Sequence, residues 1–582
     1  MTGKRLAFAA STVALVTLLA GAGSAGSRAL SARDHLRTAQ SLVQQLQREL
    51  LAMDPDAAAG TLGRLQRQTR AARADLSHPG VRIGAHLPMA GDDLAAARTV
   101  TAVLDDLAHD GLPQVVAAAR LVRELGIGRD PGPLRRAAPG LARAELAFRR
   151  ARATIGAIPR AGLAGPVRQA VLDLEDRLPD AVRLLGVAAR TAALLPGLLG
   201  DSGPRTYLVL FQNLAEVRAT GGMPGAFVVV RADHGRIRIA DQGSATGLRP
   251  FARPVLPLSA SDRQLWTDKP AVYPADVNLT PHFPTVARLA REMYRRRSGT
   301  TVDGVFATDP VALSYLLGAL GPVPVPGGAT LRADNAVRLL LSEIYAARNS
   351  ARGQDAYFAA AARAVFQAVL RRPPEPLTLK DALVRAAAER RMLVWSAHEQ
   401  ENRLLDGTTL DGVLPERDGD RPAVGVFLND GSGAKLGYYL THSARLAVTP
   451  ACRRDGRREM TLRVVLGSTA PRSGLSASVL GLGLAGDPYT TRTNVSVYSP
   501  AGGAVTGMRV DGAATSFGSG RDRRRAVGTV TLDVPAGGRR VLDVTLLSGS
   551  PGARVRPRLW LTPGVAPWAQ LIDSGDICPA SR

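Results

Sequence analysis

The sequence is poor in the residues from which most catalytic, metal and nucleic-acid sites are built. Its 582 residues include two cysteines, eight histidines and four lysines, and aromatic residues make up 4% of the chain. Two cysteines exclude a disulfide-rich scaffold, and their spacing fits no zinc site. Walker loops and His-Glu-x-x-His or Cys-x-x-Cys motifs are absent. The lack of aromatic stacking platforms argues against nucleic acid as a partner.

Arginine and apolar residues are abundant by contrast. Lys and Arg total 74 against 50 Asp and Glu, which gives a formal net charge of +24. This excess would attract the chain to anionic surfaces such as phospholipid, teichoic-acid-like polymers or phosphorylated glycans. Hydrophobic residues make up 45% of the chain, enough for sizeable cores, and the length allows about three domains.

The N-terminus predicts export. Lys4 and Arg5 precede an uncharged run of 18 residues, Leu6–Gly23. This run is near the lower limit for crossing a bilayer, and it also fits a cleavable signal peptide with cleavage near Ala20–Ala22. We therefore assign residues 1–28 as a signal anchor or signal peptide. In the anchored case the protein is a single-pass protein of the cell membrane, and its bulk is extracytoplasmic. We expect no other segment to span a membrane.

Composition divides the remaining chain into three zones, so the expected fold class is multidomain α+β. Residues 29–199 are rich in Ala, Leu and Arg, and they predict a bundle or stalk of long helices. Residues 200–405 alternate between strand and helix patterns, which predicts an α/β domain on a mixed sheet. Residues 406–582 carry short alternating strands between Pro-Gly turns and predict a sandwich-like β domain.

Individual elements of the central zone can be placed from their patterns. Residues 206–212 predict a buried strand, and 226–241 predict a hairpin that turns at His234-Gly235. Pro310 opens a helix that ends at Gly321, and residues 379–398 predict another helix.

The two cysteines fall in the β-rich zone. In an exported chain we expect Cys452 and Cys578 to form one disulfide, which would close a loop worth roughly 3–5 kcal/mol. The alternative is two buried thiols.

One polar segment stands out for its chemistry. Residues 211–225, FQNLAEVRATGGMPG, leave a strand and present polar groups followed by glycines that allow close backbone approach. Such an arrangement suits an oxygen-rich ligand, and an arginine there could hold a phosphate or carboxylate through two hydrogen bonds. The alternative is that these groups only satisfy one another around a tight turn. The candidate ligand-binding residues are Gln212, Asn213, Glu216, Arg218 and Thr220, together with Arg205 at the start of the strand.

A second segment, YPADVNLTPHFP at residues 273–284, is proline-rich and predicts a loop. Asp276 and Asn278 could face a ligand or a hard cation. The alternative is an Asx-turn network that caps the following helix.

These segments resemble a bacterial, often actinobacterial, family catalogued as domain of unknown function 4012. The resemblance rests on TYLVLFQNLAEVRATGGMPGAF, DVNLTPHFP and VDGVFATDPVALSYLLGALGPV, and on the later LNDGSGAKLGYYL and the Cys452 region. It implies an exported, membrane-anchored protein and no established activity. An aromatic and an acidic residue are common in the family at the positions of Leu279 and His282, which weakens the transfer of a cation site to Asp276.

A more distant resemblance is to LytR-CpsA-Psr proteins, which move glycopolymers from a polyprenyl-pyrophosphate carrier. The spacing of six residues fits the core of that family: Asp303, Asp309, Gly321, Asn335, Asp355 and Gln367. The arginines that grip pyrophosphate in that family are mostly missing, although Arg348 and Arg352 could partly substitute. This resemblance implies magnesium near Asp276 or Asp309. It also requires Arg205, Arg218 and Arg348 to converge on one cleft, because the transfer depends on fixed cations.

Two hypotheses follow. The first is a membrane-anchored envelope protein, without a catalytic set or cofactor, that binds an anionic cell-envelope polymer or a lipid-linked glycan. The competing one is a glycopolymer transferase of LytR-CpsA-Psr type that uses magnesium.

Overall fold

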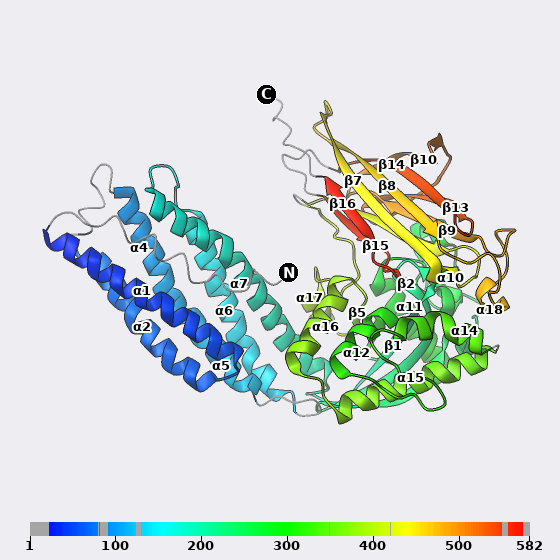
Figure 1. The fold of residues 1–582 in the computed structure, drawn as a ribbon, viewed down its shortest axis with the longest axis horizontal. Helices are drawn as coiled ribbons and strands as arrows, with labels where there is room; N and C mark the ends of the chain where they lie inside the picture. Colours follow the sequence, from blue (N-terminus) through cyan, green and yellow to red (C-terminus); the bar gives the residue numbers. More distant parts are fainter. Residues whose placement is uncertain are drawn as a thin grey trace. The chain divides into compact units, whose positions relative to one another are not determined.

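The computed structural model describes residues 23–79, 81, 91–123, 130–348, 350–418, 421–549 and 557–573. The chain divides into two compact units, Met1–Pro204 with Ala232–Arg236, and Arg205–Arg231 with Ile237–Arg582. The chain is thus multidomain α+β, with a helical N-terminal part and mixed sheets after it (Figure 1). The apolar run at residues 6–23 lies outside the described residues except for Gly23, so the anchor remains a prediction.

The first unit consists of long helices. α2 (Pro55–Ser77) begins at Asp54-Pro55, where Asp54 Oδ1 accepts from the amide of Ala57 at 3.0 Å and Pro55 occupies the first turn. The helices are α1 (Gly23–Leu51), α2 (Pro55–Ser77), α4 (Gly91–Asp106), the π-helical turn η2 (Leu107–Gly111), α5 (Leu112–Arg123), α6 (Gly132–Gly156) and α7 (Gly165–Leu198).

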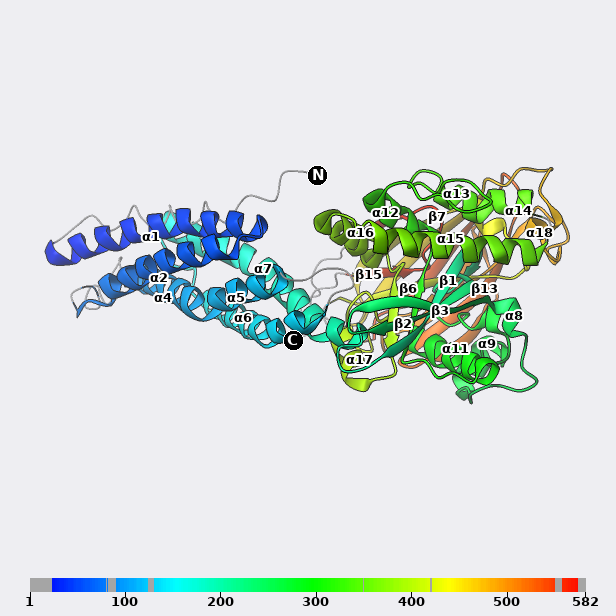
Figure 2. The ribbon, with the colours of Figure 1, turned by 90° about the horizontal axis from the view of Figure 1, so that it is seen from below.

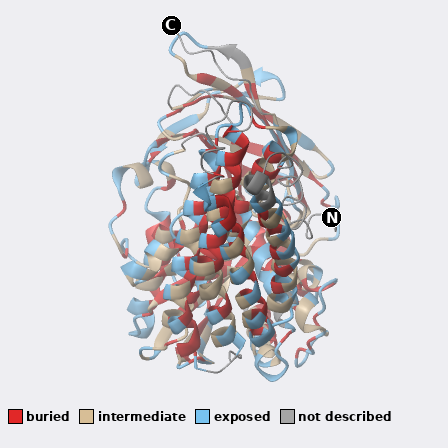
Figure 3. Ribbon diagram, turned by 90° about the vertical axis from the view of Figure 1, so that its left-hand side faces the viewer, coloured by how far each residue is buried: buried red, intermediate tan, exposed pale blue. Residues whose placement is uncertain are grey.

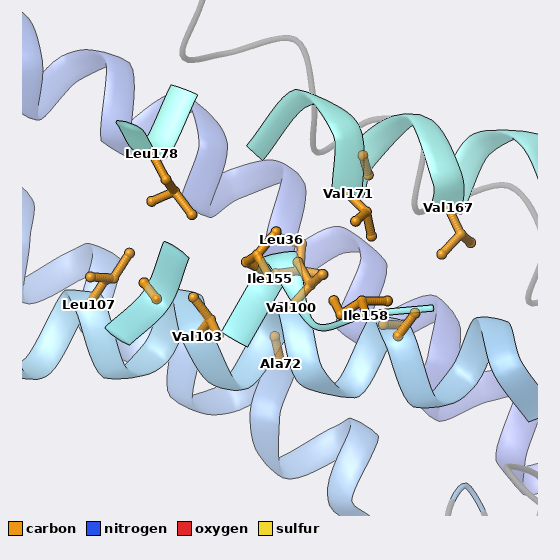
Figure 4. Close-up of a cluster of buried hydrophobic side chains, with 14 of the residues drawn as sticks. Leu36, Ala72, Val100, Val103, Leu107, Ile155, Ile158, Val167, Val171 and Leu178 are labelled. Carbon is orange, nitrogen blue, oxygen red and sulfur yellow. The ribbon is translucent and has the colours of Figure 1, made fainter. Parts of the chain in front are cut away.

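These helices share a core of aliphatic side chains and alanine. Leu36 of α1, Val100 of α4, Ile155 of α6 and Val171 of α7 point into one cluster (Figure 4). Buried positions run in stripes along the helices, and exposed positions lie between them (Figure 3). The helices are therefore held by packing along their lengths.

One of these helices also meets the criteria for a membrane span by length and composition. Among the described residues, α7 contains an 18-residue window of mean hydropathy 1.4, of which 33% is buried. Our expectation that no segment besides the N-terminal run qualifies was therefore wrong. The cause is the run of Ala, Leu and Gly after Asp180, in which the charged residues are widely spaced. The same helix packs along α6 through buried residues such as Leu178 and Leu185, as a core helix does.

The second unit begins with a five-stranded mixed sheet of order β3-β2-β1-β4-β5. Its strands are β1 (Arg205–Arg218), β2 (Gly221–Asp233), β3 (Arg236–Ser244), β4 (Gly304–Thr308) and β5 (Leu393–Ser396). β1 pairs in parallel with β4, and β4 pairs antiparallel with β5. The expected hairpin turn at His234-Gly235 is confirmed, with positive φ at both residues.

Helices lie on both sides of this sheet. α11 (Phe283–Ser298), with the short α8 (Ala245–Leu248) and α9 (Ala260–Trp266), lies on one side (Figure 2). On the other side lie α12 (Pro310–Leu320), α15 (Ala351–Arg371) and α16 (Pro376–Ala388). Shorter turns complete this part: α10 (Lys269–Val272), η3 (Pro274–Asp276), α13 (Ala336–Arg338), η4 (Leu339–Glu343), α14 (Ile344–Ala347) and α17 (Glu399–Leu405).

The prediction of a helix over residues 379–398 was wrong for the second half of this range. α16 ends at Ala388, and Arg390 takes φ +54°, which a helix cannot continue through. Leu393–Ser396 then adds to the edge of β4 as β5. The sequence LVWS favours a strand. Because β4 offers a free sheet edge, these residues pair with it and do not continue the preceding helix.

The last part of the unit consists of two sheets, of order β11-β10-β14-β8-β7-β16 and β12-β13-β9-β6-β15. Buried side chains of both sheets, such as Val426 and Val464, belong to one hydrophobic cluster. The strands are β6 (Ala423–Asp430), β7 (Leu440–Cys452), β8 (Arg458–Ser468), β9 (Thr491–Tyr498), β10 (Ala504–Val510), β11 (Ala513–Ala514), β12 (Gly518–Asp522), β13 (Arg525–Val534), β14 (Arg539–Leu547), β15 (Arg558–Leu561) and β16 (Ala569–Asp573). The short η5 (Leu436–Tyr439) and α18 (Ala477–Leu480) lie in loops.

The predicted pairing of the two cysteines lies outside the described residues. Cys452 ends β7, but its side chain is outside the described part of the chain, as is all of Cys578. The disulfide therefore stays a prediction.

Candidate functional site

The polar motif at residues 211–225 lies inside a long hairpin and not just after a strand, as the sequence had suggested. β1 continues to Arg218, and β2 begins at Gly221. Gly222 makes this close pairing possible: a Cβ there would lie 2.1 Å from the carbonyl oxygen of Asn213. The two glycines therefore allow the backbone of β2 to pack closely against β1. The close approach that the motif indicated is thus made by the protein's own backbone and not by a ligand.

Three of the candidate residues form one buried amide–hydroxyl cluster. Thr220 donates from Oγ1 to Gln212 Oε1 at 2.7 Å. Asn278 Nδ2 lies 2.8 Å from Thr220 Oγ1, 2.8 Å from the carbonyl oxygen of Gly222 and 3.2 Å from Gln212 Oε1. The opposite atom, Asn278 Oδ1, is buried and makes no hydrogen bond within the described residues. The hydrogen bonds of Asn278 therefore hold the 273–284 loop against the hairpin of β1 and β2.

Arg218 and Asp276 form an ion pair beside this cluster. Arg218 is 7% exposed and donates from Nη2 to Asp276 Oδ1 at 2.9 Å. Nη1 of Arg218 donates to the carbonyl oxygen of Val217, while its Nε is buried without a hydrogen bond among the described residues. Burial raises the pKa of the nearby Asp430, and the charge of Arg218 opposes that rise. One guanidinium thus lies near two carboxyl groups.

Asn213 and Glu216 lie on the same strand and contact residues outside this cluster. Asn213 donates to the hydroxyl of Tyr345 at 2.8 Å, and Glu216 pairs with Lys435 at 2.7 Å. The ammonium of Lys435 also lies over the ring of Tyr345, 5.2 Å from its centroid. These contacts connect β1 to η5 and to the end of α14.

The C-terminal sheets join this junction through Asn429 on β6. Its Oδ1 accepts from the amide of Ala219, and its Nδ2 donates to the carbonyl oxygen of Leu279 at 3.1 Å. Three segments that are far apart in sequence therefore meet at the end of β1: residues 211–225, 273–284 and 428–440. Most of their polar groups satisfy one another, as the alternative for the first segment proposed.

Arg205 and Arg348 lie in other surroundings. Arg205 begins β1 and faces Asp303 and Glu401 at 3.8 and 3.6 Å. Arg348 donates to the carbonyl oxygen of Gly327 and lies over the ring of Tyr357. Arg205 and Arg218 stand at opposite ends of β1, about 40 Å apart at the usual rise per residue. The side chain of Arg352 is outside the described part.

The two carboxylates named for magnesium do not fit a cation site. Asp276 faces Arg218, and Asp309 is buried against Arg391 at 3.0 Å while it also caps α12 through the amide of Ala312. A metal ion would have to displace an arginine in either place. Within the described residues, no group of three or more His, Cys, Asp or Glu side chains is arranged to hold a metal.

Sequence reasoning missed Tyr345, Asn429 and Lys435. Lys435 could have been noticed, since lysine is so rare in this chain and LNDGSGAKLGYYL had already been singled out. It also gave the arginines at 521–525 no structural role. Arg525 is in fact buried, where it pairs with Asp418 and donates to the carbonyl oxygens of Ala423 and Ser499.

Comparison with known proteins places part of this site in a family. No curated protein and no solved structure matches the chain. A family model described as "Protein of unknown function (DUF4012)" matches residues 202–345, which include β1, β2, the 273–284 loop and Tyr345. The resemblance to the family of unknown function 4012 is thus confirmed over residues 202–345, the part of the chain that matches this family model.

Proposed function

We propose that this chain is an extracytoplasmic envelope protein, held in the cell membrane by one N-terminal span, that binds an anionic glycan or a lipid-linked envelope ligand at Arg218. The helical unit would act as the stalk. The two C-terminal sheets, which share one core, would form a β-sandwich that supports the binding domain.

The observation that carries this proposal is the incomplete use of the Arg218 guanidinium. It is buried, yet Nε makes no hydrogen bond in the described structure, and its one ion-pair partner is Asp276. The Asp276 side chain is 24% exposed, so an anion arriving from solvent could replace it on Arg218. Charge-assisted hydrogen bonds to an arginine are strong and suit phosphate or carboxylate.

The overall charge supports an anionic partner. A net charge of +24 would raise the rate of encounter with a phosphorylated polymer or an anionic lipid headgroup. The transferase alternative lacks comparable support, because Arg205, Arg218 and Arg348 have no partner in common. We therefore favour binding over group transfer.

The test is a binding measurement on the full chain with two probes, a poly(glycerol phosphate) and a polyprenyl phosphate in detergent. Asp276→Asn removes the competing carboxylate, so we expect tighter binding of at least one probe. Arg218→Ala combined with Asn213→Ala should abolish it. Arg463→Ala is the matched control, since Arg463 also pairs with one aspartate, Asp543, but lies on β8.

Equal affinity of the double variant and the wild type would rule out this site. Looser binding by Asp276→Asn would show that the carboxylate supports the ligand and does not compete with it. Circular dichroism of each variant separates loss of binding from loss of fold.

A further inference from the structure

A second site candidate includes the end of the 273–284 loop. Pro281 and His282 form one wall of a cleft, the linker at 414–416 forms another, and the β12–β13 turn at 522–525 forms the third. Tyr498, at the end of β9, completes the lining. The cleft measures about 340 Å³ with its open mouth, and the part that water can occupy is about 20 Å³. That inner space holds about one water molecule.

The inner end of the cleft has an unsatisfied hydroxyl. Tyr498 is 1% exposed, and its hydroxyl makes no hydrogen bond within the described part of the chain. The carboxyl of Asp522 adjoins this hydroxyl without meeting hydrogen-bond geometry, and it is itself paired with Arg523. A buried hydroxyl without a hydrogen bond is unfavourable, so a ligand oxygen or a water should complete it.

His282 supplies a donor in the same lining. Its Nδ1 accepts from the amide of Thr285 at 3.2 Å, so in the neutral ring the proton is on Nε2. Burial lowers the pKa of His282, and Arg523 and Arg288 lower it further, so the ring is neutral at pH 7.

Size and charge decide which group fits. Carboxylates of Glu416 and Asp522 line the cleft together with Arg523, Arg524 and Arg525, and Arg525 is already paired with Asp418, so the acidic and basic groups balance there. A phosphate would face both carboxylates. A single hydroxyl fits the space, and it can donate to a carboxylate while it accepts from Tyr498. The walls of Pro281, Leu414 and Pro415 offer apolar contact for the C–H face of a sugar ring.

We propose that this cleft binds a neutral sugar unit of a glycan, with one hydroxyl inserted beside Tyr498 and the Asp522–Arg523 pair. The inference rests on the proposed function, because it names the sugar that would accompany an anionic group held at Arg218. The 273–284 loop contributes to both places, through Asp276 and Asn278 on one side and through Pro281 and His282 on the other.

The experiment is saturation-transfer NMR on the full chain with glucose, galactose and mannose as separate probes. We expect at least one of the three hexoses to bind, and Tyr498→Phe to weaken that binding about three- to tenfold. The variant removes a hydroxyl that adjoins Asp522 but makes no hydrogen bond of good geometry within the described residues, so the fold should be little affected. Tyr489→Phe, on a tyrosine outside this cleft, is the matched control and should bind like the wild type.

Three outcomes would overturn the inference: no binding of any hexose, equal affinity in Tyr498→Phe, or displacement of the hexose by inorganic phosphate. The result is separable from that at Arg218, because Arg218→Ala with Asn213→Ala should leave hexose binding unchanged. Hexose binding lost in that variant but kept in Tyr498→Phe would place the sugar at Arg218 instead.

Discussion

Arg391 donates from Nη1 to Oδ2 of Asp309 at 3.0 Å, and both side chains are almost completely buried. Arg391 lies just before β5, and it also donates to Glu389 and to the carbonyl oxygen of Gly564 beyond β15. Burial raises the pKa of Asp309 although Arg391 opposes that rise. Through its contacts with Asp309 and Gly564, Arg391 therefore connects the central sheet to the C-terminal part of the unit. Two charged groups are buried as a result.

Removing one partner of this pair should be strongly destabilising. We expect Arg391→Leu to lower the free energy of unfolding by about 3–5 kcal/mol, because Asp309 is left buried without its cation. The double variant Arg391→Leu with Asp309→Asn should recover part of that loss. Thermal melts of both variants measure this coupling, and additive effects of the two substitutions would contradict it.

Stability should depend on pH through Asp411. Burial, followed by the charge of Asp406, raises the pKa of Asp411 to about 6, although the amides of Val413 and Gly407 oppose this. The folded state therefore holds a proton that the unfolded chain releases near its ordinary pKa of about 4. This contribution to stability is fully present below pH 4 and is lost as the pH rises through 6, on the order of 2 kcal/mol.

The comparison of wild type with Asp411→Asn isolates that effect. Urea midpoints measured from pH 4 to pH 7 should fall more steeply in the wild type than in the variant. Parallel curves would show that Asp411 titrates alike in both states.

Gly222→Ala should disrupt the hairpin of β1 and β2. The new Cβ would lie 2.1 Å from a backbone oxygen of Asn213, which cannot swing away as a side-chain end can. We expect a loss of more than about 3 kcal/mol, as for other overpacked sites at the upper end of their range. Gly507→Ala, on β10 with nothing within 4 Å of the added Cβ, is the control and should be nearly neutral. Equal melting temperatures of the two variants would refute this account.

The predicted disulfide would join two segments that follow paired strands. β16 runs parallel to β7 and pairs Asp573 with Ala447. Cys578 follows Asp573 by as many residues as Cys452 follows Ala447. A disulfide needs its α-carbons within roughly 7 Å of each other, and the pairing stays a prediction because Cys578 lies outside the described residues.

Mass spectrometry of the unreduced chain should find Cys452 linked to Cys578, and Cys578→Ser should lower the melting temperature. Two thiols that alkylate without a reductant would contradict the pairing.

Local signals in the sequence predicted the elements that depend on neighbouring residues. The His234-Gly235 turn and the helix from Pro310 to the residue before Gly321 follow from capping and turn chemistry. β5 could not be predicted in this way, since its strand depends on an edge that β4 offers from far along the chain.

The candidate site was predicted as a set of residues but not as an arrangement. Polar residue types at 212–220 and 276–278 predicted a binding site, which stays a prediction, and the structure places these residues where three segments meet. Which partner each would take depends on tertiary contacts such as Asn429 to Ala219 and Lys435 to Glu216, for which the spacing of residues gives no signal. Arg205 belongs to the same strand, yet the length of β1 separates it from the others.

The parallel pairing of β1 with β4, from Tyr207–Gly304 to Phe211–Thr308, has a mechanical consequence. β1 is the first strand after α7, so in the proposed anchored protein a pulling force would enter this sheet at the start of β1. Under a force along the strands, the hydrogen bonds between the two strands would bear the load together in shear, instead of opening one after another as in a zipper. This pairing would help the domain that carries Arg218 to stay folded under load.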